Sequence, residues 1–286
     1  MRPFRKAFRK AWLVLLMIPV LFFIYAPLAW LVTSSISTRA DLLAMPPRFF
    51  PEHPTLQNYI DILVPGTAVS EVAATFKVTL VNSLIVSLTT TFICLVIASL
   101  AAYALARLRI RFKNHIIGSI LSVRMIPEIS LVIPLFIVAA RLGWLDKPIV
   151  LIVTYLSFAL PFAIWMLTTF FETIPVEMED AALIDGSSRL NTLFRVILPL
   201  ASPGIVSTAL FIFLLAWDEF FFALIFTSTV AAKTVPVAIA EFTGRYAVDI
   251  TAMMTGGVLA ALPPVILALI FQRYIVSGLS AGAVKG

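Results

Sequence analysis

Long apolar stretches separated by short polar segments dominate the pattern of hydrophobic and polar positions along this chain. Six of the stretches have about 20 residues or more, the length that an α-helix needs to cross a bilayer. They cover approximately residues 12–32, 78–105, 116–140, 148–171, 203–227 and 253–274. Because a helix satisfies its backbone polar groups within one segment, we predict an all-α, polytopic membrane protein with six transmembrane helices.

The composition agrees with this prediction. Of the 286 residues, 61% are hydrophobic and 13% are charged, whereas soluble domains carry about 25% charged residues. The alternating pattern of a membrane β-barrel is absent. The single cysteine, Cys94, lies inside an apolar run and excludes a disulfide within the chain. The net charge of +6 comes largely from basic residues beside the spans, so we expect no nucleic-acid partner.

The distribution of basic residues predicts the orientation. With the N-terminus in the cytoplasm, 13 Lys and Arg residues face inside, 7 face outside, and Arg124 falls within a span. This bias favours two cytoplasmic termini. The first apolar run is long for a signal peptide and lacks a clear cleavage site, so we predict a retained helix. The expected organisation is a cytoplasmic N-terminal segment 1–11, a first transmembrane helix 12–33, an outer-face segment 34–77, a core 78–274 that includes a cytoplasmic loop 173–198, and a cytoplasmic tail 275–286.

One polar segment between two apolar runs predicts an ordered pair of helices. Pro175 suits the start of a helix, since its missing N–H is not needed there, and acidic residues follow in the first turns. Gly186 suits the left-handed end of that helix. Ser187 or Ser188 can cap a second helix that runs to Pro199. In the outer-face segment, the apolar stretch 59–63 predicts one or two helical turns.

The polar segment also resembles a known signature. Asp180-Ala181-Ala182, three residues, Gly186, nine residues and Val196-Ile197-Leu198-Pro199 are similar to the loop found in permease subunits of binding-protein-dependent ABC importers. The family pattern has Glu where this chain has Asp180 and Ile where it has Val196, and both changes are conservative. The resemblance implies the type I ABC importer permease fold in a bacterial or archaeal cytoplasmic (inner) membrane.

Further segments resemble the carbohydrate-uptake branch of this family, in particular the smaller maltose-transporter permease. They are the stretches 124–127, 217–220 and 278–286. The resemblance implies that the signature loop forms a coupling helix seated in a cytoplasmic ATPase. Its contact core would be Asp180, Ala181, Ala182 and Gly186, with Glu179 and Asp185 flanking that core. The resemblance also implies that the tail contacts the ATPase dimer through Ala281, Gly282, Lys285 and Gly286; a frayed tail is the alternative.

Charged residues inside the spans are candidates for the translocation pathway, because ionisable groups at membrane depth usually face a cavity or a partner. Arg124 and Glu128 stand four residues apart and are expected to pair on one helical face. Pro127 and Pro134 predict a kink in the same span. A structural ion pair near the membrane boundary is the alternative.

Trp217, Asp218 and Glu219 form a second pathway candidate. Carboxylates can accept hydrogen bonds from sugar hydroxyls, and aromatic faces can cover the apolar side of a sugar ring. The alternative is that these aromatic residues pack against lipid or a neighbouring helix.

The chain lacks a P-loop sequence, and we identify no catalytic residues, no metal ligands and no cofactor site. The resemblance therefore implies a non-enzymatic subunit, with ATP and Mg on a partner. The implied partners are a second permease subunit (as a heterodimer), two ATP-binding cassette ATPase subunits, an extracellular or periplasmic solute-binding protein, a sugar-like substrate and the lipid bilayer.

The predicted function is ATP-driven import of a sugar, meaning a mono- or disaccharide, a polyol or a sugar derivative. Three alternatives stay open. The first is the same architecture for another solute such as glycerol 3-phosphate, although only Arg124 offers a cation within a span. The second is a membrane-embedded enzyme that uses Glu128, Asp218 and Glu219 as catalytic carboxylates. The third is a scaffold that docks a partner without transport.

Overall fold

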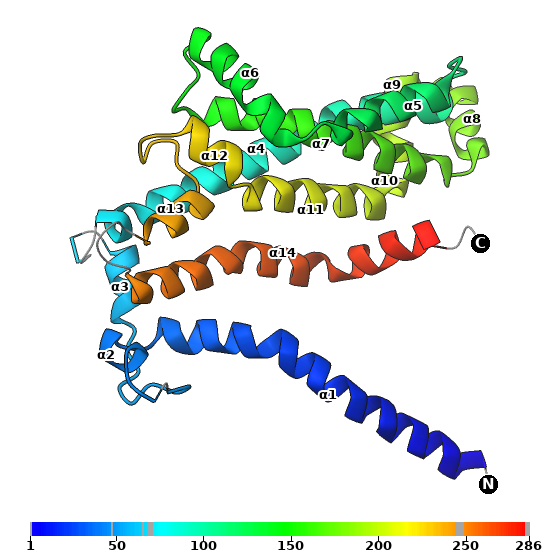
Figure 1. Cartoon of the computed structure of the whole chain (residues 1–286). Coiled ribbons are helices and arrows are strands. Elements are labelled where there is room, and N and C mark those ends of the chain that lie inside the picture. Colours follow the sequence, from blue (N-terminus) through cyan, green and yellow to red (C-terminus); the bar gives the residue numbers. More distant parts are fainter. Residues whose placement is uncertain (1, 47, 65, 68–70, 244–248, 284–286) are drawn as a thin grey trace. The chain divides into compact units, whose positions relative to one another are not determined.

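The computed structural model of the chain is built from helices (Figure 1). It describes residues 2–46, 48–64, 66–67, 71–243 and 249–283. These residues fall into two compact units. The first holds the chain up to Lys77 together with Ile239–Leu262, and the second holds Val78–Ala238 together with the chain from Pro263.

Four of the six predicted spans are confirmed as continuous helices. They are the first, second, fourth and sixth, and each is long and apolar enough to cross a membrane. The helices are α1 (Arg2–Ser35), α4 (Glu71–Arg107), α7 (Pro148–Glu172) and α14 (Ile250–Ala283). They were predictable because apolar length is a sufficient signal for a spanning helix.

The third span is not the single helix that we predicted. It consists of α5 (Lys113–Ser122), the short 3-10 turn η1 (Val123–Met125) and α6 (Glu128–Arg141), with an angle of 89° between the two parts. Pro127 explains the break, since a proline pushes the preceding residue towards extended backbone. Ile126 adopts φ −74° and ψ 124°. The predicted kink is therefore confirmed at Pro127, whereas Pro134 lies inside α6.

The fifth span is also interrupted, which the sequence did not predict. Helix α11 (Ser202–Asp218) ends before Glu219, and α12 (Phe221–Phe226) begins two residues later. The Glu219 carboxylate accepts hydrogen bonds from the backbone N–H groups of Phe222 (2.8 Å) and Ala223 (3.2 Å). This side chain thus satisfies amide groups that have no partner within the first turn of α12.

In the first unit, short helices fold over the end of α1. These are α2 (Arg39–Leu42) and α3 (Gln57–Leu63), and α3 confirms the predicted turns around residues 59–63. The Asn58 side chain donates to the carbonyls of Ser35 and Ser37, both at 2.9 Å. The Tyr59 and Ser35 hydroxyls are 2.7 Å apart. These bonds fix α3 on the end of the first span.

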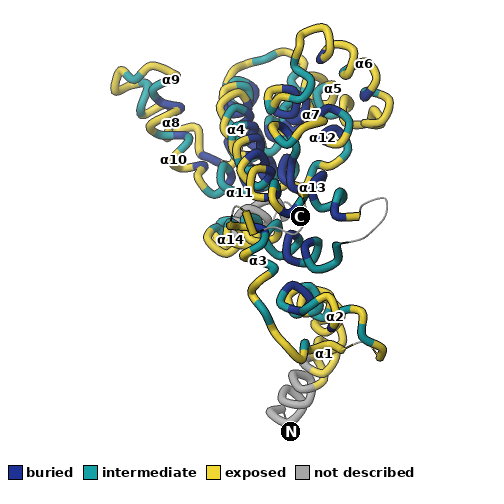
Figure 2. Tube along the Cα trace, turned by 90° about the vertical axis from the view of Figure 1, so that its left-hand side faces the viewer, coloured by how far each residue is buried: buried dark blue, intermediate teal, exposed yellow. Residues whose placement is uncertain are grey.

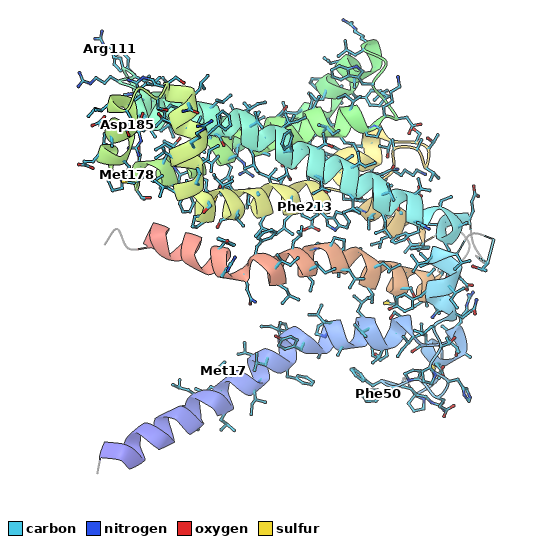
Figure 3. All side chains as sticks on the ribbon, turned by 180° about the vertical axis from the view of Figure 1, so that it is seen from behind. Met17, Phe50, Arg111, Met178, Asp185 and Phe213 are labelled. Carbon is cyan, nitrogen blue, oxygen red and sulfur yellow. The ribbon has the colours of Figure 1, made fainter. Side chains whose placement is uncertain are left out.

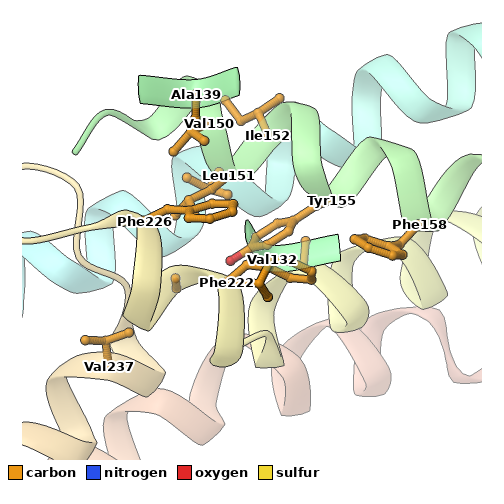
Figure 4. Packing of buried hydrophobic residues seen from close by; sticks show 13 residues of the cluster. Val132, Ala139, Val150, Leu151, Ile152, Tyr155, Phe158, Phe222, Phe226 and Val237 are labelled. Atoms are coloured by element: carbon orange, nitrogen blue, oxygen red, sulfur yellow. The ribbon is translucent and has the colours of Figure 1, made fainter. Parts of the chain in front are cut away.

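In the second unit, α7 forms the centre of the core and packs against α5, α11 and α12. Figure 4 shows aromatic and aliphatic side chains of α7, α6 and α12 meeting in one buried cluster. The rings of Phe158 and Phe222 stack with their centroids 5.2 Å apart. Helix α13 (Val235–Glu241) begins where the Val235 N–H donates to the Ser83 hydroxyl of α4 at 2.8 Å.

Asp146 ties two loops of the second unit together. Its carboxylate accepts hydrogen bonds from the N–H groups of Ser228 (2.8 Å) and Thr229 (2.9 Å) and from the Thr229 hydroxyl (2.7 Å). Burial acts to raise the pKa of Asp146, but the hydrogen bonds from Thr229 and Ser228 outweigh burial and hold this pKa below its ordinary value. The ionised carboxylate therefore stabilises the junction between the α6–α7 loop and the segment after α12.

Replacing Asp146 by asparagine is expected to destabilise the protein by no more than about 1 kcal/mol at neutral pH, because solvent screens the charge of this partly exposed carboxylate. The folded-state pKa lies below the unfolded value of about 3.9, so this stabilisation is complete above the unfolded value and is lost as the pH falls through the folded pKa. The difference in thermal midpoint between the native protein and Asp146→Asn should stay constant above about pH 5 and shrink at lower pH. A difference that does not change with pH would contradict this assignment.

Candidate functional site

The polar segment of residues 175–200 folds into a helical hairpin in the second unit. Helix α8 (Val176–Ile184) begins one residue later than predicted, with Pro175 just before it. Gly186 has φ +84°, as predicted for a helix stop. The N–H of Gly186 donates to the Leu183 carbonyl (3.1 Å), and the N–H of Ser187 donates to the Ala182 carbonyl (3.0 Å). This pair of bonds is the Schellman motif, which ends a helix at a left-handed residue.

The second arm of the hairpin returns to the core. Ser188 caps α9 (Arg189–Thr192) by accepting a hydrogen bond from the Asn191 N–H at 3.3 Å. A π-helical turn, η2 (Leu193–Ile197), and α10 (Leu198–Leu200) follow. The side chains of Leu193 and Ile197 are fully buried in a cluster with residues of α4 and α7. The hairpin is therefore held rigidly against these two helices.

A buried charge network fixes α8 to the end of α4. The Glu179 side chain is only 4% exposed and the Arg107 side chain 5%, and Oε2 of Glu179 lies 3.1 Å from Nε of Arg107. These two atoms are not aligned for a hydrogen bond, so their attraction is mainly electrostatic. The Tyr103 hydroxyl donates to Oε1 of Glu179 at 2.5 Å. The more exposed Arg189 lies 3.6 Å from the same oxygen.

Arg107 also holds the entry to α8, because its guanidinium donates to the Ile174 carbonyl at 2.7 Å. Tyr103, Arg107 and Arg189 were not predicted from the sequence as site residues. The one feature that could have pointed to them is Arg107, which follows a long apolar run in the sequence. We used it only to count basic residues for the orientation. A cavity of about 590 Å³ beside the network is lined by residues of α4, α8 and α9.

The outward side of α8 exposes apolar and small residues. Ile184 is 85% exposed and Met178 is 46% exposed. Of the six residues expected to contact a partner, four are exposed: Asp180, Ala181, Asp185 and Gly186. Figure 3 shows Met178 and Asp185 at the same end of the second unit as Arg111. Figure 2 shows α8 and α9 with largely exposed residues on their outer side.

The other two expected contact residues lie differently. Ala182 is half-buried. Glu179 does not lie on the contact surface that we expected, since its side chain points into the network with Arg107 and Tyr103. At about 100° per residue, Ala181 lies on the opposite side of α8 from Glu179. Glu179 therefore orients the helix, while the exposed residues are free to meet a partner.

The tail is described only in part. Helix α14 continues to Ala283, so Ala281 and Gly282 are helical. Lys285 and Gly286 lie outside the described residues.

The expected ion pair between Arg124 and Glu128 is absent from the described structure, and this prediction was wrong. Arg124 belongs to η1 and Glu128 is the first residue of α6, so the break at Pro127 separates them onto two elements. Both side chains are exposed. The Arg124 guanidinium instead lies over the Phe162 ring, 5.7 Å from its centroid.

The three residues at the end of α11 have different environments. Trp217 is 2% exposed and stacks on Phe213 with their centroids 5.5 Å apart. Glu219 accepts a hydrogen bond from the Tyr155 hydroxyl at 2.6 Å in addition to its bonds with α12. Asp218 alone of the three is exposed. The side chains of Asp218, Arg124 and Glu128 are therefore exposed, whereas Trp217 and Glu219 are engaged in packing and capping.

Within the described residues, no group of three or more His, Cys, Asp or Glu side chains is placed to hold a metal ion.

Residues 94–281 match the family described as the inner membrane component of binding-protein-dependent transport systems. The chain belongs to this family. Over 261 residues, this permease is 39% identical to the trehalose/maltose transport system permease protein MalG of Thermococcus litoralis, an alignment that covers 91% of each chain. It is 38% identical to the sulfoquinovosyl glycerol transport system permease protein SmoH of Agrobacterium fabrum over 260 residues, which are 91% of the permease and 88% of SmoH.

The fold of the permease also matches a solved structure. A chain of a bacterial ABC transporter involved in the import of the acidic polysaccharide alginate superposes with a TM-score of 0.79, at 21% sequence identity. The match covers 96% of the permease and 98% of that chain. The permease thus has the all-helical, multi-pass membrane fold of ABC importer permeases.

Proposed function

We propose that this permease is the transmembrane subunit of an ATP-driven ABC importer for a sugar, forming half of the translocation pathway. The two named relatives, MalG and SmoH, carry transport names for trehalose and maltose and for sulfoquinovosyl glycerol. Both names denote solutes that contain a sugar ring. The substrate class that we propose is therefore a mono- or disaccharide, a polyol or another sugar derivative, delivered by an extracellular or periplasmic binding protein.

The observation that carries the coupling role is the exposed apolar side of a rigid α8. Ile184 and Met178 are large apolar residues, and their side chains are 85% and 46% exposed; a group of exposed apolar residues marks contact with a partner. Nothing lies within 4 Å of a side chain built at Gly186. We propose that this side docks into a separate ATPase, with Asp180, Ala181, Asp185 and Gly186 in the contact, and that ATP and Mg bind to that partner.

The remaining assignments follow from the same proposal. The hairpin and both termini face the cytoplasm, in agreement with the excess of basic residues there. A second permease subunit completes the pathway as a heterodimer, and two ATPase subunits complete the complex. Asp218, Arg124 and Glu128 are the accessible candidates for lining the pathway, and the residues of the tail contact the ATPase dimer. The complex belongs to a bacterial or archaeal cytoplasmic membrane.

Replacing Ile184 by aspartate is expected to abolish sugar uptake and co-purification of the ATPase, with no loss of membrane expression. Ile184 is 85% exposed, so the substitution removes no internal packing, whereas it places a charge in the docking surface. The measurements are uptake of labelled sugar into cells or proteoliposomes and the amount of ATPase recovered with the tagged permease. Leu142→Asp is the matched control, since Leu142 is 52% exposed in the loop after α6 and should retain both activities. Normal uptake by Ile184→Asp would refute the docking assignment.

The solute class has its own test. A ligand screen on the cognate binding protein, followed by uptake measurements through the complete importer, should identify a neutral sugar or a sugar derivative. Uptake of glycerol 3-phosphate in preference to sugars would favour the alternative solute and would leave the coupling assignment intact. Turnover of a solute by the purified permease without any ATPase would instead refute the importer assignment.

A further inference from the structure

The loop between α2 and α3, at residues 43–46 and 48–54, exposes several large apolar side chains. Met45 is 95% exposed, Phe50 73%, Leu43 58% and Phe49 43%. Exposed apolar residues that are scattered singly need no explanation, but a group of them marks contact with a membrane or a protein. We call this group the aromatic loop, and all of it belongs to the first unit.

Hydrogen bonds hold the aromatic loop at both ends. Before it, Thr38 and Asp41 form a capping box at the start of α2, in which the Asp41 N–H donates to the Thr38 hydroxyl at 3.2 Å and the Thr38 N–H donates to the Asp41 carboxylate at 3.3 Å. After it, the Thr55 N–H donates to the Ile36 carbonyl at 2.8 Å. Both anchors lie next to the end of α1 at Ser35. Both ends of the loop therefore lie beside the end of the first span.

Aromatic contacts join the loop to the side of α1. The Phe49 ring lies 5.5 Å from the Trp30 ring of α1, and the Phe50 ring packs edge-on against Phe49 at 5.2 Å. Figures 1 and 3 agree that the loop turns back beside α1, and Figure 3 labels Phe50 there. The neighbouring residues of α1 are apolar and half exposed, with Leu28 and Val32 at 52% and 51%. The aromatic loop thus continues the apolar surface of the first span.

The position of Trp30 along α1 gives the depth of this contact. The membrane-crossing part of α1 is Leu15–Ser35, and Trp30 lies five residues before its end. At 1.5 Å per residue, Trp30 lies about 7.5 Å inside the end of the helix. Peripheral apolar surfaces insert roughly 5–10 Å into the boundary between headgroups and acyl chains, where tryptophan is enriched. Phe49 packs on Trp30 at this depth.

We propose that the aromatic loop is inserted into the membrane interface at the Ser35 end of α1, with lipid as the partner of Met45, Phe49 and Phe50. The neighbouring charges fit a headgroup position, because Arg48 forms an ion pair with Glu52 and a long arginine side chain can reach the polar layer from an apolar site. The loop is then a second anchor of the first unit beside the spanning helix. This inference does not depend on which solute the importer carries.

Site-directed spin labelling of the full complex in lipid nanodiscs tests the proposal. Cys94 is the single cysteine of this chain and is fully buried, so its replacement by alanine gives a permease subunit without cysteine. A label at Phe50→Cys is expected to be more accessible to oxygen, which concentrates in lipid, than to a water-soluble nickel chelate. A label at Gln57→Cys is the matched control, since Gln57 is exposed on α3 in the same segment, and its preference should be reversed.

Two outcomes would overturn the proposal. If the label at residue 50 is as accessible to nickel as the label at residue 57, the aromatic loop projects into water. If the label at residue 50 is immobilised and protected from both reagents, a protein partner rather than lipid covers the loop. Because Phe50 is 73% exposed, its replacement removes little internal packing. The labelled protein should therefore fold, and either result can be measured on it.

Discussion

Replacing Glu179 by glutamine is expected to lower the stability of this permease by about 3–5 kcal/mol, since removing one member of a buried ion pair leaves its partner uncompensated. Arg107, whose side chain is 5% exposed, would keep its charge and its bond to the Ile174 carbonyl but lose its counter-ion. For a chain of this size the thermal midpoint should fall on the order of 10 °C. Glutamine has the same shape as glutamate and can still accept a hydrogen bond from the Tyr103 hydroxyl. The loss of stability therefore measures the effect of removing the charge, not the effect of a cavity.

The matched control is Glu177→Gln. Glu177 is an exposed acidic residue of the first turn of α8, so the change should cost no more than about 1 kcal/mol. A second variant, Arg107→Met in the Glu179→Gln background, removes the unpaired charge and should recover part of the stability. Equal midpoints for Glu179→Gln and Glu177→Gln would show that the buried ion pair does not hold α8.

Glu179→Gln should also weaken the coupling between ATP hydrolysis and transport. Since the network orients the exposed side of α8, complexes that contain the Glu179→Gln permease should hydrolyse ATP in their ATPase subunits with weaker dependence on the binding protein and substrate. A purely stabilising role for Glu179 would leave that dependence unchanged in the protein that remains folded.

Gly204→Ala is expected to be the most damaging single-methyl change in the core of the second unit. An alanine Cβ at this position would lie 2.3 Å from Cγ of Phe170 and 2.5 and 2.7 Å from its two Cδ atoms. These are the ring atoms nearest to the Cβ of Phe170, so a small rotation of the ring cannot relieve the clash. Overpacking of this kind costs about 1–3 kcal/mol or more, because α11 must move away from α7.

The measurement is the thermal midpoint together with the yield of folded protein from membranes. Phe170→Ala combined with Gly204→Ala should be more stable than the sum of the two single changes predicts, since alanine at position 170 removes the clash. Gly118→Ala is the control, because nothing lies within 4 Å of a Cβ there and alanine favours the helix by up to about 1 kcal/mol. Additive effects of the Gly204 and Phe170 changes would argue against close contact between α7 and α11.

The spans that the sequence predicted correctly are those for which length and hydropathy are sufficient. Length and hydropathy were not sufficient for the third span. Pro127 signals a kink, but the angle of 89° depends on how α5 and α6 pack. The fifth span breaks at Glu219 without proline or glycine, because Tyr155 and the amides of α12 bind its carboxylate. None of these partners is marked by a local sequence pattern.

In the candidate site as well, features set by local sequence were predicted and features set by long-range contacts were not. The stop at Gly186 and a cap at Ser187 or Ser188 follow from local backbone chemistry, and both were predicted; the structure places the cap at Ser188. The burial of Glu179 was not, since its partner Tyr103 is 76 residues away along the chain. A charged residue in a polar segment is normally exposed, and only tertiary contacts with α4 reverse this expectation. Long-range pairing therefore decided which acidic residue points inward.

The break between η1 and α6 has a consequence for what surrounds the third span. The first amides of a helix lack partners inside the helix, and α6 begins at Glu128 within this span. The Ser130 N–H donates to the Pro127 carbonyl at 3.0 Å. An amide group that faces hydrocarbon without a hydrogen bond costs several kcal/mol. The amides of this first turn that lack such a bond therefore need a protein or water partner at this depth, which makes the break a polar point in an otherwise apolar crossing.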